Sequence, residues 1–326
     1  MNKIIAFDLA GGDKGEKASV PAVYDFLDLF PDWKIIGFTD KSDVVSKKSN
    51  FEIIKVKTNI AQEDKPLAVK RKKDNTLVRA MELVKEGKAD AIVSAANSGA
   101  LVFGAYSLFP SIKKGVKPGF APFATKAYGQ LFTMLDVGAN LDADAKALEN
   151  YALMGQELIK ALGFHDNPSV KLLNVGLEPE KGNALLRETY KVLQANDHIK
   201  FMGNIEGNQI LIDDESEVII TTALEGNIAL KVIEGSIMVF VKMLKTNADK
   251  NFMSKIGLGL AKSFRDDFKK NILNEEYLGG AIVVGLNKLV IKAHGASNSK
   301  MLTNALKTTK TLLENDVIKN FEEVLK

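Results

Sequence analysis

The sequence predicts an α/β protein with an open, mostly parallel sheet that is covered by helices on both faces. Short, fully apolar runs alternate with helix-like stretches, and each run ends in a polar or Gly-rich loop. Such runs are typical of strands buried on both faces of a parallel sheet. The 326 residues are 46% apolar and 26% charged, which is ordinary for a globular protein and sufficient for one large domain.

The strand–loop–helix pattern recurs along the chain in order. Five apolar runs are predicted strands: residues 3–7, 91–93, 131–135, 171–175 and 218–220. Two helices have clear end signals: residues 76–85, capped by Asp74-Asn75 and ended by Gly87, and residues 142–162, ended by Gly163. Residues 113–119 and 164–169 read as loops within one domain that spans 1–326, with a helical segment around 236–275 that projects for dimer or membrane contact.

Composition and missing motifs exclude several classes of protein. The chain has no cysteine, so it has no disulfide, thiolate nucleophile or Cys-based metal site. Its three histidines are scattered, so we expect no metal. A net charge of +3 is too small to indicate nucleic-acid binding. G-x-G-x-x-G after a strand, a P-loop and G-x-S-x-G are all absent, so we expect no nucleotide cofactor and no α/β-hydrolase.

The protein is expected to be cytoplasmic. The apolar run at residues 4–7 ends at Asp8, which is too short for a signal peptide. Residues 91–112 carry no charge and are long enough to span a membrane, but they contain Asn97 and Pro110. A buried strand, a polar loop and a buried helix explain this stretch better.

The polar loops predict a binding site for a small anion. In parallel sheets, ligands bind outside the carboxyl ends of the strands. We therefore expect all five loops at one sheet edge. Gly11-Gly12-Asp13, Asn97-Ser98-Gly99 and Gly226-Asn227 place small residues and amides where phosphate can approach a helix N-terminus. The alternatives are a tight turn for Gly11-Gly12 and ordinary helix capping for the other two loops.

Three further segments of the sequence contain basic side chains or a histidine. Lys181-Gly182-Asn183 follows a predicted strand and is either ligand-facing or a solvated surface loop. His294 follows an apolar strand and is either a proton donor or base or a structural histidine. Residues 70–73 (Lys-Arg-Lys-Lys) form a solvated face or attract an acidic partner.

Residues 251–264 form a basic amphipathic segment. Phe252, Met253, Ile256, Leu260 and Phe264 share one helical face, with lysines and Arg265 around it. Such a helix can lie on an anionic membrane. Packing against another helix or a second subunit is the alternative.

Taken together, the loops resemble one known family. The motifs are Leu-Asp-Val-Gly-Ala-Asn at 135–140, Lys-Gly-Asn at 181–183, Gly-Asn-Ile-Ala-Leu-Lys at 226–231 and Val-Ile-Lys-Ala-His-Gly at 290–295. In order and over nearly the whole chain, they are similar to the phosphate acyltransferases of bacterial phospholipid synthesis (PlsX family). The resemblance implies a three-layer α/β/α fold like that of phosphate acetyltransferase and isocitrate dehydrogenase, usually as a homodimer.

The resemblance also implies a reaction and its partners. A long-chain acyl group passes from acyl carrier protein to inorganic phosphate, and the acyl phosphate then goes to a membrane glycerol-phosphate acyltransferase. The enzyme would be cytoplasmic, with peripheral contact at the inner membrane face through 251–264, and without a cofactor. Phosphate is the nucleophile, so no catalytic Ser or Cys is needed.

The resemblance, read with the loop chemistry, assigns roles to individual residues. Lys181, Asn227 and His294 are the expected catalytic residues. The expected substrate- and phosphate-binding residues are Asp8, Gly11, Gly12, Asp13, Asn97, Ser98, Gly99, Asp136, Asn140 and Asn183.

The chain departs from the family pattern at a few positions. Thr222-Ala223 replaces Asp-Gly, Ala96 replaces Gly and Ala10 replaces Met. These changes leave alternatives open: a phosphate acetyltransferase-like enzyme that uses acyl-coenzyme A, or a non-catalytic scaffold that binds acyl carrier protein. A dehydrogenase is a distant further alternative.

Overall fold

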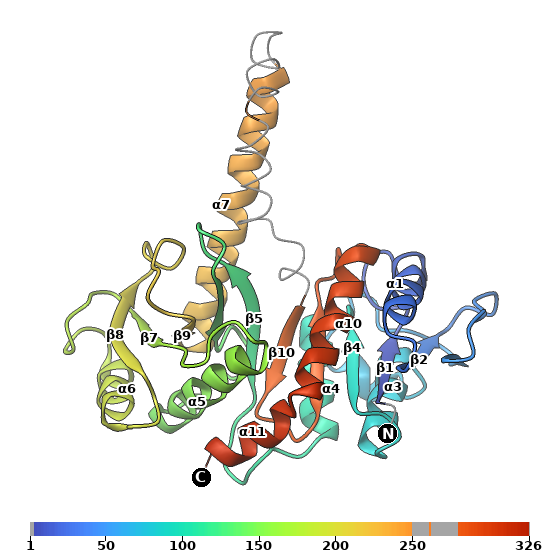
Figure 1. The fold of residues 1–326 in the computed structure, drawn as a ribbon, viewed down its shortest axis with the longest axis horizontal. Helices are drawn as coiled ribbons and strands as arrows, with labels where there is room; N and C mark the ends of the chain where they lie inside the picture. The colour runs from blue at the N-terminus through green and yellow to red at the C-terminus, as the bar shows by residue number, and fades with distance from the viewer. Residues whose placement is uncertain (1–2, 250–260, 262–279, 326) are drawn as a thin grey trace.

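A computed structural model describes residues 3–249, 261 and 280–325, and these form an open sheet flanked by helices (Figure 1). The strands are β1 (Ile4–Asp8), β2 (Lys34–Thr39), β3 (Phe51–Lys55), β4 (Ala91–Ser94), β5 (Gly119–Thr125), β6 (Leu131–Leu135), β7 (Val170–Asn174), β8 (Phe201–Glu206), β9 (Val218–Ile220), β10 (Gly280–Val284) and β11 (Leu289–Ala293). The helices are α1 (Glu16–Leu29), α2 (Ala68–Arg71), α3 (Thr76–Lys85), α4 (Ser98–Leu108), α5 (Ala145–Ala161), α6 (Ala184–Ala195), α7 (Ala223–Asp249), α10 (Ser299–Glu314) and α11 (Val317–Val324).

The predicted fold class is confirmed. Each of the five predicted strands is present, with ends shifted by no more than one residue. The predicted helix at 76–85 is α3, and the Asn75 side chain caps it by accepting a hydrogen bond from the Val78 N–H. The long helix α5 begins at Ala145 because Asp144, rather than Asp142, caps it through the Ala147 N–H. The uncharged stretch at 91–112 is strand β4, a loop and helix α4, and no described helix is long and apolar enough to cross a membrane.

Strand direction differs from the prediction. The sheet order is β3-β2-β1-β4-β11-β10-β5-β6-β9-β7-β8. The strands from β3 to β11 are mutually parallel, and so are those from β6 to β8, but β10 and β5 between them pair antiparallel. The two parallel groups therefore run in opposite directions. The prediction that all five loops lie at one edge was wrong, because a fully apolar run does not encode the direction of its strand.

Strand β5 connects the two groups. Its first half, Gly119 to Pro122, pairs with β10, and its second half, Phe123 to Thr125, pairs with β6. Proline has no N–H for a strand ladder, so it fits best where regular pairing is interrupted. Pro122 lies where β5 changes partner, and its carbonyl accepts a hydrogen bond from the Thr133 hydroxyl.

The core forms two layers, one on each face of the sheet. Apolar side chains of α1, α5, α6, α10 and α11 pack on one face. On the other face, α3 and α4 pack over the first parallel group and α7 packs over the second. Figure 1 shows α7 extending well beyond the body of the molecule. Except for Ala261, the predicted membrane segment 251–264 lies outside the described residues.

Candidate active site

A cavity of about 900 Å³ opens between α4 and α7, on the sheet face that these helices share. This volume is within the usual range of ligand pockets, roughly 300–1,000 Å³. Its floor is β5 with the adjoining ends of β10 and β11. Both parallel groups contribute to it, because the first turn of α4, which follows β4, and the loop after β6 both line it. The cavity thus joins chain segments that the sheet directs to opposite edges.

Most of the cavity is lined by apolar side chains. Phe120, Pro122 and Ala124 of β5 line it and are only half-buried, while their neighbours along the strand are buried, because successive side chains of a strand face opposite sides of the sheet. The apolar lining comes from α4, β5, the 208–212 turn and α7: Val102, Phe103, Phe120, Pro122, Ala124, Leu211, Leu230, Ile233 and Ile237. Such a surface fits a hydrocarbon chain better than a nucleotide.

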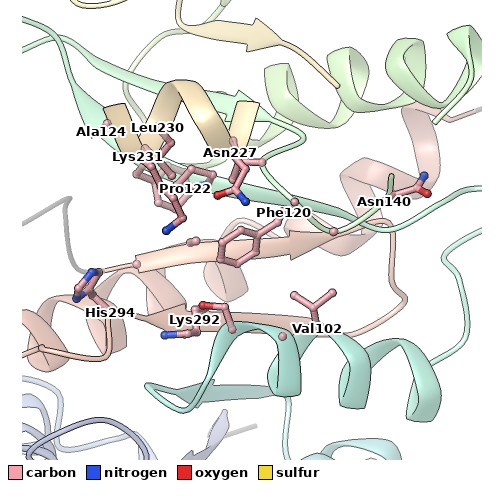
Figure 2. A pocket seen from close by; sticks show the side chains of 18 of the residues that line it. Val102, Phe120, Pro122, Ala124, Asn140, Asn227, Leu230, Lys231, Lys292 and His294 are labelled. Carbon is pink, nitrogen blue, oxygen red and sulfur yellow. The ribbon is translucent and has the colours of Figure 1, made fainter. Parts of the chain in front are cut away.

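One end of the cavity gathers nitrogen-bearing side chains. Figure 2 shows Lys231 extending from α7 and Lys292 from β11 on opposite sides of the cavity, with His294 at the same end. Ser98 and Gly99, in the first turn of α4, also line the cavity. A helix N-terminus favours negative charge through its unpaired amides and its dipole. This end is therefore suited to an anion.

His294 has a defined hydrogen bond. Its Nδ1 accepts a bond from the Ala296 N–H at 3.2 Å, which assigns the ring proton of a neutral imidazole to Nε2. The side chain is exposed and lines the cavity. His294 can accordingly donate a hydrogen bond from Nε2 to a ligand, and its catalytic role stays a prediction.

Asp136 shapes the loop after β6. It is fully buried, and its carboxylate accepts hydrogen bonds from the backbone N–H groups of Phe120, Gly138, Ala139 and Asn140. Burial raises the pKa of this carboxyl, against the lowering effect of those amides. Its oxygens are thus directed into the protein, so it positions the cavity-lining stretch 137–140 instead of facing the ligand.

Asn227 lies opposite that loop on the first turns of α7. Its side chain lines the cavity and lies close to Gly138, where an added Cβ would be 3.6 Å from the amide nitrogen. Gly226 permits this approach, because a Cβ there would lie 2.3 Å from the Asp136 carbonyl oxygen. Asn140 also lines the cavity, at its far end in Figure 2, and donates to the Tyr151 hydroxyl at 3.3 Å.

The loop after β1 lies next to the cavity without lining it. A Cβ at Gly11 would lie 2.8 Å from the Ala96 amide, and Gly12 has a φ of 87°. The Asp13 N–H donates to the Gly295 carbonyl at 2.8 Å. The glycines are therefore accounted for by close packing against the loops after β4 and β11. Asp8 is buried and accepts a bond from the Ser94 hydroxyl at 2.7 Å.

Three more predicted residues are not brought into the cavity. Asn97 caps α4, accepting from the Ala100 N–H while its amide donates to the Gln62 carbonyl. Asn183 caps α6. Lys181 lies on the exposed loop after β7, 3.9 Å from the Glu178 carboxylate. Strand β9 separates β7 from β6, which explains why this loop begins away from the cavity.

Lys231 and Lys292, two of the lysines that line the cavity, were not predicted as site residues. Both had been noted only as members of the family motifs at 290–295 and 226–231. The available signal was the composition of β11, where Lys292 is the single charged residue of a strand that is buried at every position. A lysine is almost never fully buried unless its charge has a use.

Similarity to solved structures identifies the fold. A phosphotransacetylase from Streptococcus pyogenes aligns with a TM-score of 0.58 over 96% of this chain and 94% of its own, at 16% identity. A branched-chain phosphotransacylase from Enterococcus faecalis V583 aligns with a TM-score of 0.56 over 95% and 99%, at 10% identity. The fold is therefore that of the phosphotransacylases.

Sequence similarity is more specific. Residues 4–320 match the family described as fatty acid synthesis protein. The phosphate acyltransferase of Bacillus pumilus (strain SAFR-032) is 38% identical over 96% of this chain and 95% of its own. That of Staphylococcus aureus (strain MRSA252) is 35% identical over 98% of each. The chain belongs to this family, among the phosphate acyltransferases, and the resemblance inferred from its loop motifs is confirmed.

Proposed function

We propose that this chain transfers a long-chain acyl group from acyl carrier protein to inorganic phosphate, giving acyl phosphate and free carrier for phospholipid synthesis. The observation that carries the proposal is that one end of the cavity gathers Lys231, Lys292 and His294, while most of the other lining residues are apolar. One end suits phosphate and the other an acyl chain. Family membership supports the same reaction.

The reaction needs positioning and charge stabilisation more than a protein nucleophile. A phosphate oxygen attacks the thioester carbonyl carbon, and the carbonyl oxygen becomes an oxyanion. As the tetrahedral intermediate collapses, the C–S bond breaks and the carrier leaves as a thiolate, which takes up a proton. Cations and N–H donors placed where this charge develops lower the barrier.

Cavity residues are proposed for these roles. The amide of Asn227 orients the reacting groups, and His294 donates from Nε2 to the oxyanion or the leaving sulfur. Ser98 and Gly99 present the N-terminus of α4 to the phosphate. The catalytic role of Lys181 stays a prediction, since this residue lies outside the cavity lining.

Acyl carrier protein is proposed to dock beside α2. Arg71 and Lys73 are exposed, while Lys70 lies over the Phe103 ring at 5.0 Å, and Phe103 lines the cavity. The basic residues at 70–73 therefore flank the cavity. An acidic carrier would be attracted there, with its thioester arm entering the cavity.

A homodimer and a peripheral membrane contact are also proposed. Described residues of α7 expose apolar side chains at heptad-like spacing: Leu224, Ile228, Val232, Val239 and Met243. Exposed stripes of this kind mark interaction surfaces. Membrane contact through 251–264 rests on the sequence pattern alone.

The proposed function is tested by measuring acyl phosphate, trapped as a hydroxamate with hydroxylamine. Palmitoyl-acyl carrier protein, palmitoyl-coenzyme A and acetyl-coenzyme A are compared as donors, with and without phosphate. We expect phosphate-dependent product with the carrier-bound long chain. A preference for acetyl-coenzyme A would favour the phosphate acetyltransferase alternative. Carrier binding without product from any donor would favour the scaffold and implicate Thr222-Ala223.

A further inference from the structure

A row of polar side chains crosses three adjacent strands beside the cavity. In the strand register, Asp8 of β1 pairs with Ser94 of β4, and Ser94 pairs with Lys292 of β11. The row continues through Ala281 of β10 to Pro122 of β5, both of which line the cavity. Residues paired in register share a sheet face. Lys292 is therefore the point at which the polar row meets the apolar floor.

The ammonium of Lys292 is buried without a counterion. The residue is 6% exposed, and its Nζ donates to the backbone carbonyls of Ala95, at 3.5 Å, and Ala293. In the described part of the chain, Lys292 forms no ion pair, although Asp8 and Asp13 are near enough to attract it. A buried charge that lacks a partner is expensive, so proteins rarely keep one without a ligand for it.

We propose that Lys292 binds the acceptor phosphate, which lies between it and Lys231 on the opposite wall of the cavity. This inference rests on the proposed function and names the residues that hold its acceptor. Phosphate supplies the missing negative charge, and the N-terminus of α4 at Ser98 supplies further donors. The apolar floor beyond Ala281 then directs the acyl thioester toward the phosphate oxygen.

Lys292 is surrounded by charged and titratable side chains, and its protonation depends on whether an anionic ligand is bound. Asp8 and Asp13 face it from β1 and the following loop, His294 follows it on its own strand, and Lys231 faces it from α7. Burial lowers the pKa of Lys292 to about 8, against the attraction of the two aspartates. A bound phosphate stabilises the ammonium, so by linkage phosphate affinity falls as the pH rises above about 8.

The test measures binding of inorganic phosphate itself, by titration calorimetry without an acyl donor. Lys292→Met keeps the length of the side chain and removes its charge. We expect it to weaken phosphate binding by roughly tenfold or more, as for the loss of a charged hydrogen bond. Lys288→Met, directly before the first residue of the same strand and outside the cavity lining, is the matched control and should bind as the wild type. Equal affinity in the Lys292 variant and the wild type would overturn the proposal.

Two further readouts separate ligand binding from a structural role. Phosphate should raise the melting temperature of the wild type but not that of Lys292→Met. Without phosphate, Lys292→Met should melt at a higher temperature than the wild type. In the wild type alone, phosphate affinity should fall from pH 7 to pH 9, and a flat profile would count against the proposal even if the variant did not fold. If the wild type binds phosphate as expected but makes no acyl phosphate, the proposed function fails and the phosphate site stands.

Discussion

We expect the buried ammonium of Lys292 to destabilise the folded protein when no ligand is bound. Its pKa is about 8 in the folded protein against 10.5 ordinarily. The unfolded chain therefore binds more protons between these values, and stability rises with pH across that window. Below pH 8 the penalty is fully present, at about 1.4 kcal/mol for each unit of difference, or about 3 kcal/mol at most.

Lys292→Met should accordingly be more stable than the wild type at pH 7, by as much as about 3 kcal/mol, and this advantage should shrink toward pH 10. Denaturant unfolding without phosphate at pH 7 and pH 9.5 measures it. A variant that is less stable than the wild type at pH 7 would show that the two carbonyl hydrogen bonds of Lys292 outweigh its desolvation.

The sequence predicted which loops lie near the cavity better than it predicted which individual residues line it. Ser98, Gly99, Asn140, Asn227 and His294 do line the cavity. The Gly11-Gly12 and Asn97 signals were real but reflect packing and capping, which the sequence analysis had held as alternatives. A cap and a ligand site use the same residue types at the same position, so only the surrounding contacts distinguish them.

At the scale of elements, the junction between α7 and the loop after β6 sets the geometry of the cavity. A Cβ at Gly226 would lie 2.3 Å from the Asp136 carbonyl oxygen and 2.5 Å from Thr221 Cγ2. Gly226→Ala should therefore displace the first turn of α7, reduce stability by roughly 1–3 kcal/mol and lower acyl phosphate formation. Thermal unfolding and the hydroxamate assay measure the two effects.

Gly235→Ala is the control on the same helix. Among the described residues, no atom lies within 4 Å of a Cβ built there, so the substitution should stabilise the helix by up to about 1 kcal/mol through helix propensity. Equal effects at Gly226 and Gly235 would mean that the contact with Asp136 does not constrain α7.

The existence of the fully apolar strands could be predicted, but their direction could not. The run at 131–135 is apolar at nearly every position, and β6 is buried throughout, so burial on both faces followed from the sequence. Strands β2, β3, β5, β8 and β10 were not predicted. Strand β5 contains Pro122, which argues against a central strand, and the antiparallel pairings of β5 and β10 are set by distant parts of the chain.

The exposed apolar stripe of α7 leads to a prediction about the oligomeric state. Ile228 and Val232 are 55% and 60% exposed, one helical turn apart. If the stripe forms the dimer interface, Ile228→Asp with Val232→Asp should convert a dimer to a monomer, because each charge would be desolvated on association. Light scattering after size exclusion measures the mass. Leu29→Asp on α1, at a comparably exposed site, should leave the dimer intact.

At the scale of the whole molecule, the net charge of +3 conceals an uneven distribution. Basic residues at 70–73 lie outside the cavity beside Phe103, and Lys231 and Lys292 lie within it. The outer group suits docking of an acidic carrier, and the inner pair suits a small anion. The two steps should therefore respond differently to salt, because ionic screening acts mainly on exposed charges.

Arg71→Glu with Lys73→Glu should lower kcat/KM for palmitoyl-acyl carrier protein by roughly tenfold or more at low salt, through slower and weaker docking. The defect should shrink at high salt, where the exposed charges are screened in wild type and variant alike. With palmitoyl-coenzyme A as donor the loss should be smaller, because no protein surface docks. Lys191→Glu with Lys200→Glu changes the net charge equally at other exposed positions and should have little effect with either donor. An equal loss of kcat/KM in both double variants would mean that the change in overall charge causes the loss. The carrier would then dock at another surface.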